Sequence, residues 1–206
     1  MNDLNKEIVN FYDLIKAGQG SAIKAHIETN YANTEQDYYR VRSLVTTIPL
    51  ESAARFFYLR KTSFRGIYRE NKKGQFNVPY GNYKKMDLSC LTDEKYKDLL
   101  SNTVFLNGDF SLVFNNLNAD DFVFLDPPYD ETFSDYHSSG FGSTEHKKLA
   151  DLFKQTPAKC MLIIKETEFI NELYDGYIKA SYGKKYSVTT GHKTIDDTKH
   201  LIITNF

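Results

Sequence analysis

This chain lacks the signals of a membrane or secreted protein. It has no apolar run near the roughly 18 residues that span a bilayer, and no basic start followed by a small-residue cleavage site. Cysteine is scarce as well, since only Cys90 and Cys160 occur, and their spacing is not that of metal ligands. We therefore expect a cytoplasmic protein without a membrane partner, in which both cysteines are reduced and structural.

Histidine clusters and sequence repeats are also absent. The 5 histidines do not have the spacing of zinc ligands, so we predict no metal site. No internal repeat or low-complexity linker interrupts the 206 residues. The composition, 41% hydrophobic and 26% charged, is typical of a globular domain that is large enough to bury a full core.

The distribution of charge is more informative than its sum. A net charge of −1 argues against a protein that coats nucleic acid without specificity. Basic residues nevertheless crowd the segment from Arg55 to Lys85, where Glu70 is the single acid, and aromatic residues alternate with them: Tyr58, Phe64, Tyr68, Phe76, Tyr80 and Tyr83. A solvated charged face is one interpretation of this segment, but the aromatic residues favour a surface that binds nucleic acid.

The motif with the clearest chemistry follows an apolar run. Residues 122–125 read as a buried strand, and Asp126-Pro127-Pro128-Tyr129 comes directly after them. The motif places a carboxylate, a rigid turn and an aromatic ring at the end of that strand. An ordinary turn is the alternative, because Asp before Pro often starts one.

These residue types suit methylation of an exocyclic amine on a flat ring. The N6 lone pair of adenine is delocalised into the ring, so the amino group is a poor nucleophile until its two N–H groups are held. The Asp126 carboxylate can accept one N–H, and the carbonyl of Pro127 can accept the other. The ring of Tyr129 offers a face on which a base can stack once it has left the duplex.

Hydrophobic periodicity predicts helices and strands that alternate along the chain. We expect helices over 5–16, 35–60, 111–116, 144–156 and 168–174, and strands over 104–107, 122–125, 161–164, 186–189 and 201–204, the last two as a hairpin. A further hairpin is expected over 72–83 with Gly74 at its turn. This order indicates an α/β sheet covered on both sides, with the basic aromatic segment inserted into it.

The glycines of Gly18-Gln19-Gly20 resemble a phosphate-binding loop, but they follow a predicted helix rather than a strand. We interpret them as the end of that helix.

Three stretches of the chain carry a likeness to one known family. They are Asn2-Asp3-Leu4-Asn5 with Asn10-Phe11-Tyr12, the long blocks 54–69 and 71–81, and Phe124 to Asp130. Through them the chain resembles the Dam family, the D12 class of adenine-specific DNA methyltransferases, over nearly its whole length. The resemblance implies a Rossmann-like S-adenosylmethionine-dependent methyltransferase sheet with an inserted helical and hairpin segment that recognises DNA.

The resemblance also implies roles for particular residues. The catalytic loop would be Asp126, Pro127, Pro128 and Tyr129. S-adenosyl-L-methionine would be held by Asp3 at its ribose hydroxyls, by Asp109 and Phe110 at its adenine, and by Asp126; turn or capping roles are the alternative for Asp3 and Asp109. DNA would be contacted by Arg60, Lys61, Arg65, Tyr68, Arg69, Asn71, Lys72, Asn77 and Tyr80. From their position after the catalytic loop alone, and not from the resemblance, residues 134–137 are expected to form a lid over the flipped base.

The same resemblance divides the chain and exposes a departure from the family. Residues 1–34 and 100–206 would form the catalytic domain, and 35–99 the inserted target-recognition segment. The sequence starts at Met1-Asn2-Asp3, about where the second strand of the family ends, so we expect the glycine-rich first strand and loop of the cofactor pocket to be missing. A shortened or misplaced start, a split enzyme completed by a second chain and a decayed remnant all remain open.

The predicted function is site-specific methylation of adenine N6 in double-stranded DNA, by a monomer. The alternative is a truncated or split, catalytically silent DNA-binding relative that needs a partner chain to bind the cofactor.

Overall fold

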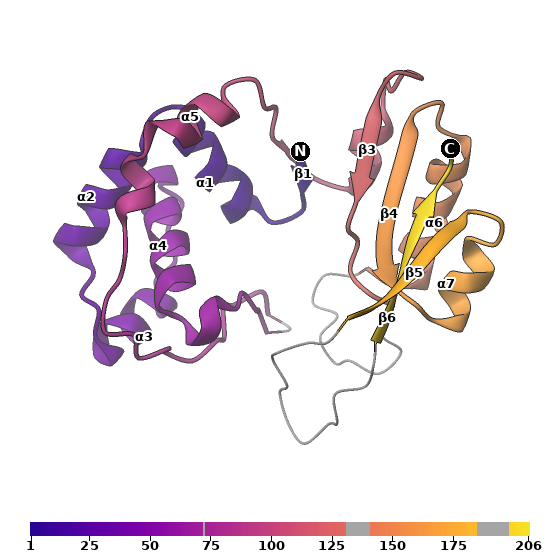
Figure 1. Cartoon of the computed structure of the whole chain (residues 1–206). Helices are drawn as coiled ribbons and strands as arrows, with labels where there is room; N and C mark the ends of the chain where they lie inside the picture. Colours follow the sequence, from indigo (N-terminus) through magenta and orange to yellow (C-terminus); the bar gives the residue numbers. More distant parts are fainter. Residues whose placement is uncertain (72, 131–140, 185–197) are drawn as a thin grey trace. The chain divides into compact units, whose positions relative to one another are not determined.

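The computed structural model describes residues 1–71, 73–130, 141–184 and 198–206. The chain forms two compact units, residues 1–112 and 113–206. In Figure 1 the first unit is largely helical, whereas the second is built on a sheet. Within the described ranges, no helix is long and apolar enough to cross a membrane.

The first unit is organised around one buried helix. Its helices are α1 (Lys6–Lys16), α2 (Gly20–Asn30), α3 (Glu35–Ser43), α4 (Pro49–Thr62) and α5 (Glu94–Leu100), with short 3₁₀ turns at Phe64–Gly66 and Ser89–Thr92. Residues 53–59 of α4 are all buried, and α1, α2 and α3 each pack against this helix. A helix that is covered on every side forms the centre of a bundle rather than its surface.

Proline and glycine set the helix boundaries in this unit. The helix predicted over 35–60 is in fact two helices, because Pro49 occupies the first turn of α4 and restricts Ile48 to an extended conformation. Gly18 follows α1 with φ of 75°, and a Cβ on Gly20 would lie 1.8 Å from the carbonyl oxygen of Leu91. The interpretation of Gly18-Gln19-Gly20 as the end of a helix is confirmed, and the structure adds that Gly20 begins α2.

Two short strands complete the first unit. β1 (Asn2–Asp3) and β2 (Leu106–Asn107) pair in parallel, with Asp3 opposite Asn107. A 3₁₀ turn, Phe110–Phe114, follows β2 where a helix over 111–116 was expected. The strand predicted over 104–107 is confirmed in its second half.

The second unit is a four-stranded mixed sheet with two helices. Its elements are β3 (Phe122–Leu125), α6 (Ser143–Gln155), β4 (Lys159–Lys165), α7 (Glu168–Leu173), β5 (Ile178–Lys184) and β6 (Thr198–Thr204), in the strand order β3-β4-β6-β5. β3 and β4 are parallel, and the other pairs are antiparallel. The strand predicted over 201–204 is confirmed within β6, which pairs with β5; its predicted partner, residues 186–189, lies outside the described ranges. The sequence missed β5 because its run Ile-Lys-Ala-Ser-Tyr-Gly-Lys contains few apolar residues.

The two faces of this sheet differ in burial. Val123 and Leu125 on β3 are buried, as are their register neighbours Cys160 and Leu162 on β4. On the opposite face, Phe122 and Phe124 are each 57% exposed. Figure 1 shows α6 and α7 together on one side of the strands. The expected cover on both faces is therefore absent from the described part of this unit, whereas the mixed α/β class is confirmed and the Rossmann-like arrangement stays a prediction.

Candidate active site and DNA-binding segment

The predicted catalytic loop leaves the sheet where expected. β3 ends at the buried Leu125, and Asp126 is exposed. Because successive side chains of a strand point to opposite faces, Asp126 continues the open face of Phe124 rather than the buried face of Leu125. The carboxylate is therefore available to a ligand at the carboxyl end of a strand, where α/β proteins commonly bind their ligands.

Two hydrogen bonds hold the end of this loop. The Tyr129 hydroxyl lies 3.1 Å from Nε2 of His200 on β6. The Thr167 hydroxyl, which also caps α7, donates to a carboxylate oxygen of Asp130 at 3.3 Å. The loop is thus tied to β6 and to the start of α7, while the predicted lid residues 134–137 lie outside the described part of the chain.

The predicted cofactor residues of the first unit lie at adjacent strand ends. Asp3 ends β1, and its Oδ1 accepts the backbone N–H of Asn5 at 2.7 Å. Asp109 follows β2 by two residues and accepts hydrogen bonds from the backbone N–H and the hydroxyl of Ser111. Phe110, the next residue, is half-buried. The parallel pairing of β1 and β2 therefore brings Asp3, Asp109 and Phe110 to one end of a sheet, while Asp126 belongs to the other compact unit.

The expected hairpin is present but starts earlier in the chain. The N–H of Asn77 donates to the carbonyl of Arg69 at 2.9 Å, and the N–H of Asn71 donates to that of Gln75 at 2.8 Å. Gly74 sits at the turn with φ of 71°. The Asn71 side chain closes the turn by accepting the N–H of Gln75 at 3.1 Å. This side chain is therefore engaged within the hairpin itself.

The predicted DNA-binding residues are unequally available. Arg60 and Arg65 are exposed, and Lys61 lies 5.4 Å above the ring of Phe57. The other described members make hydrogen bonds within the protein: Arg69 with Asn77, Asn71 with Gln75, Tyr68 with Asn5 and Glu70, and Tyr80 with Asn33. Lys72 lies outside the described ranges.

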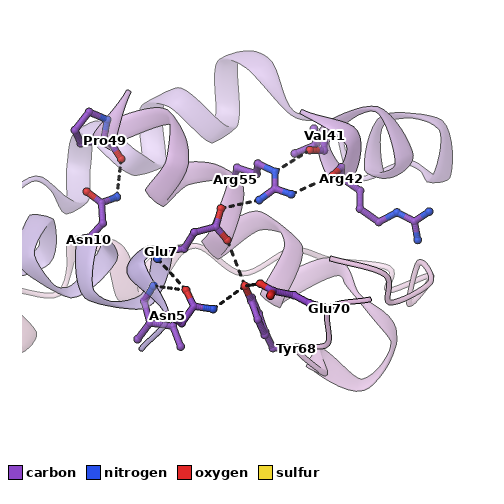
Figure 2. A network of polar contacts seen from close by, with 10 residues as sticks. Asn5, Glu7, Asn10, Val41, Arg42, Pro49, Arg55, Tyr68 and Glu70 are labelled. Carbon is purple, nitrogen blue, oxygen red and sulfur yellow. Dashed lines mark hydrogen bonds and ion pairs between the residues drawn. The ribbon is translucent and has the colours of Figure 1, made fainter. Parts of the chain in front are cut away.

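A buried polar network accounts for several residues of the basic segment (Figure 2). Arg55 is 9% exposed, donates to Glu7 at 2.8 Å, and also donates to the backbone carbonyls of Val41 and Arg42 at the end of α3. Glu7 Oε2 lies 3.5 Å from the Tyr68 hydroxyl. Burial raises the pKa of Glu7 and outweighs the attraction of Arg55, which lowers it.

The same network reaches the start of the chain. The Asn5 side-chain oxygen caps α1 by accepting the N–H of Glu7 at 2.8 Å, and its amide donates to the Tyr68 hydroxyl at 2.7 Å. That hydroxyl donates in turn to Glu70 at the base of the hairpin. Asn5 therefore links Asp3, a predicted cofactor residue that accepts its backbone N–H, with Tyr68 at the base of the predicted DNA-binding hairpin.

The network shows that part of the basic segment 55–85 is not available to bind nucleic acid. Arg55 belongs to the protein interior and adds nothing to a phosphate-binding surface. Tyr58 and Phe76 are core residues as well, at 0% and 6% exposure, whereas Phe64 and Tyr83 are exposed. Burial was hidden in the sequence because a core arginine and a surface arginine give the same local pattern.

Comparison with known proteins decides the family. Residues 1–189 match the model of the D12 class N6 adenine-specific DNA methyltransferases. The chain belongs to this family. The resemblance seen in the sequence is therefore confirmed, and the protein is an adenine-specific DNA methyltransferase by family.

Individual relatives agree with this assignment. All of this chain aligns with 80% of the type II methyltransferase M.CviBI of Paramecium bursaria Chlorella virus NC1A, at 42% identity over 210 residues. The retron Ec67 DNA adenine methylase of Escherichia coli is 33% identical over 190 residues, which cover 86% of this chain and 67% of that protein. The type II methyltransferase M.MjaIII of Methanocaldococcus jannaschii is 29% identical over 231 residues, which cover all of this chain and 79% of that protein. The comparisons lend no support to the silent alternative.

The sequence did not identify His200, Thr167 or Asn5 as site residues. His200 is one of 5 histidines without the spacing of metal ligands, so the sequence attaches no chemistry to it. Its partner Tyr129 is 71 positions away, and no local pattern could have paired them. Thr167 and Asn5 did carry a signal, since each stands directly before a helix as a typical N-cap residue.

Proposed function

We propose that this D12-class methyltransferase transfers a methyl group from S-adenosyl-L-methionine to N6 of an adenine that has been flipped out of double-stranded DNA, at one short sequence. The observation that carries the proposal is the exposed Asp126 carboxylate at the end of β3, followed directly by Pro127, Pro128 and a Tyr129 that is anchored from outside the loop. The relatives named as adenine methylases support the same base.

Asp126 and Pro127 would prepare the amino group for attack. One N–H of N6 donates to the Asp126 carboxylate and the other to the Pro127 carbonyl, which draws the lone pair out of conjugation with the ring. Tyr129 stacks against the base and sets the position of the base relative to the Asp126 carboxylate. After the new N–C bond has formed, the surplus proton of N6 passes to Asp126 or to water. Acceptors that are fixed before the reaction are worth several orders of magnitude in rate.

The residues at the end of the β1–β2 sheet suit the cofactor. Asp3 and Asp109 offer carboxylate oxygens that can accept ribose hydroxyls and an adenine amine, and the half-buried ring of Phe110 offers an apolar contact. When bound, S-adenosyl-L-methionine supplies an electrophilic sulfonium methyl, and its sulfur keeps the electron pair of the broken bond. Asp126 stays a proposed cofactor-binding residue.

Residues 35–99 would supply target recognition, and 1–34 with 100–206 the catalytic part. The exposed Arg60 and Arg65 and the basic hairpin around Lys73 would face phosphates or base edges, because guanidinium and ammonium groups carry most protein–DNA contacts. Lys61, Arg69, Lys72, Asn71, Asn77, Tyr68 and Tyr80 stay part of this proposed surface. We expect the enzyme to act as a monomer, in the cytoplasm, where its DNA lies.

Expression in a bacterial strain that lacks adenine methylation tests the proposal. Single-molecule sequencing of the host DNA should show N6-methyladenine at one short motif. The matched control is Asp126→Ala at equal protein level, which should leave the DNA unmodified.

Unmodified DNA in the presence of folded wild-type protein would contradict the proposal. Methylation on cytosine, or methylation that persists in Asp126→Ala, would contradict the assigned chemistry. A purified-protein assay with isotope-labelled methyl donor and an oligonucleotide that carries the mapped motif then gives kcat and KM.

A further inference from the structure

His200 occupies an unusual position on the open face of the second-unit sheet. In register it lies between Lys165 of β4 and Tyr182 of β5. Ile163 and Ile202, which share this face, are only half-buried, yet His200 is 0% exposed. A polar side chain is therefore more completely buried than its apolar neighbours.

Two tyrosine rings cover the imidazole. Tyr182 stacks on it at 5.6 Å between centroids, with 26° between the ring planes. Tyr129 meets it edge-on at 5.3 Å and 71°. Offset-stacked and edge-to-face contacts are the favourable geometries for aromatic pairs, so the imidazole is held between the two tyrosine rings.

The hydrogen bond adds direction to this packing. Nε2 of His200 and the Tyr129 hydroxyl lie 3.1 Å apart, and either group can donate, depending on the tautomer. The edge contact limits the tilt of the Tyr129 ring, and the hydrogen bond fixes where its hydroxyl points. Together they favour one orientation of the Tyr129 side chain.

We propose that His200 is a positioning residue for methyl transfer, which holds the Tyr129 ring in the orientation that receives the target adenine. This inference rests on the proposed function, in which that ring stacks on the base. Tyr129 is three residues after Asp126, so a change in ring orientation moves the base relative to the carboxylate that holds N6. Displacement of reacting groups by about 1 Å can lower a rate by about a hundredfold.

A second hydrogen bond holds the loop. The Thr167 hydroxyl donates to the side-chain carboxylate of Asp130, the residue after Tyr129, at 3.3 Å. Loss of the His200 contact should therefore change the orientation of the Tyr129 ring while this second hydrogen bond keeps the loop in place. The effect should appear in turnover and in the environment of one ring, rather than in the fold.

Variants at both partners test the inference. His200→Leu removes the hydrogen bond and should lower kcat by about tenfold, whereas His200→Gln keeps a polar group near the position of Nε2 and should recover most of the loss. Tyr129→Phe removes the same bond from the other side. If His200 acts through Tyr129, the decrease in kcat of the double variant should be smaller than the product of the two single decreases.

The matched control is His26→Gln. His26 also meets a tyrosine edge-on, Tyr31 at 5.4 Å, but it belongs to α2 of the first unit, whereas the catalytic loop belongs to the second unit. Its substitution should leave kcat and KM unchanged.

A fluorine label reports on the ring without any activity. With 3-fluorotyrosine at position 129, the ¹⁹F resonance should shift in His200→Leu and return toward the wild-type position in His200→Gln, in samples with equal thermal unfolding midpoints. Wild-type turnover in His200→Leu, or single decreases in kcat that multiply in the double variant, would overturn the positioning role of His200 and leave the proposed function intact. A wild-type protein that methylates no DNA would overturn the proposed function. A ¹⁹F resonance that keeps its wild-type position in His200→Leu would show that His200 does not contact the Tyr129 ring.

Discussion

The two compact units place their polar side chains in opposite ways. The first unit buries charge: Arg55 lies within its helical core and pairs with Glu7. The second unit leaves Phe122 and Phe124 exposed on one sheet face, exposes Asp126 at the strand end and buries His200. In the first unit the charged residues of the sequence are therefore partly structural, whereas in the second the polar residues gather around the reactive loop.

Tyr68 and Tyr129 show the same contrast. The Tyr68 hydroxyl is surrounded by Asn5, Glu7 and Glu70. Its pKa is raised, and burial is the largest cause. The Tyr129 hydroxyl lies 3.1 Å from Nε2 of His200. Tyr68 therefore belongs to a polar network within the first unit, whereas Tyr129 belongs to the loop that carries the reactive carboxylate.

The largest effect should come from the reactive carboxylate. Asp126→Ala should lower kcat for methyl transfer by about 10²–10³, because one preorganised acceptor is lost where charge changes in the transition state. Asp120→Ala, in the exposed turn before the same strand, is the control and should retain wild-type turnover. A rate for Asp126→Ala within twofold of wild type would remove this carboxylate from the mechanism.

The next largest effect tests whether charge in the first unit is structural. Arg55→Met should lower the free energy of unfolding by about 3 kcal/mol, because it removes a buried guanidinium and leaves the half-buried Glu7 and two helix-end carbonyls without their donor. Lys24→Met removes an exposed ion pair with Glu28 and should cost less than about 1 kcal/mol. Chemical denaturation of the wild type and the two variants measures both losses in the free energy of unfolding. Equal losses would show that burial does not make the Arg55–Glu7 pair more stabilising than the Lys24–Glu28 pair.

The raised pKa of Glu7 gives stability a dependence on pH. The unfolded chain releases the Glu7 proton near the ordinary pKa of 4.5, whereas the folded protein holds that proton to higher pH. The contribution of Glu7 to stability is therefore fully present below pH 4.5 and is lost as pH rises through the raised pKa. Denaturation midpoints across this window should fall less steeply in Glu7→Gln, and identical slopes would exclude Glu7 as the source.

The smallest effect separates exposed from engaged basic residues in DNA binding. Arg60→Ala should weaken binding equally for all sequences and reduce the slope of log K against log salt by about one, as expected for loss of one phosphate contact. Lys24→Ala, on α2, should leave the slope unchanged. Fluorescence anisotropy at several salt concentrations gives both slopes. An unchanged slope for Arg60→Ala would show that Arg60 does not contact a phosphate.

Local sequence determined much of the architecture. Asn5 before an amphipathic run starts α1, Pro49 starts α4, and the apolar run before Asp126 forms a strand that ends where the reactive motif begins. The family was also readable from the sequence, because the blocks over 54–69 and 71–81 are long and specific. Each of these features depends on residues close together in the chain, so the local pattern carries the information.

Tertiary structure alone decided which polar side chains remain available for function. Arg55 and Arg60 lie five positions apart on the same helix, yet one is buried against Glu7 and the other is exposed, because packing of α4 against its neighbours covers only part of its length. His200 meets Tyr129 across 71 positions because β6 lies beside β4, which is the parallel neighbour of β3. Contacts of this kind depend on how elements pair in space, and an individual stretch of sequence carries no record of its distant partner.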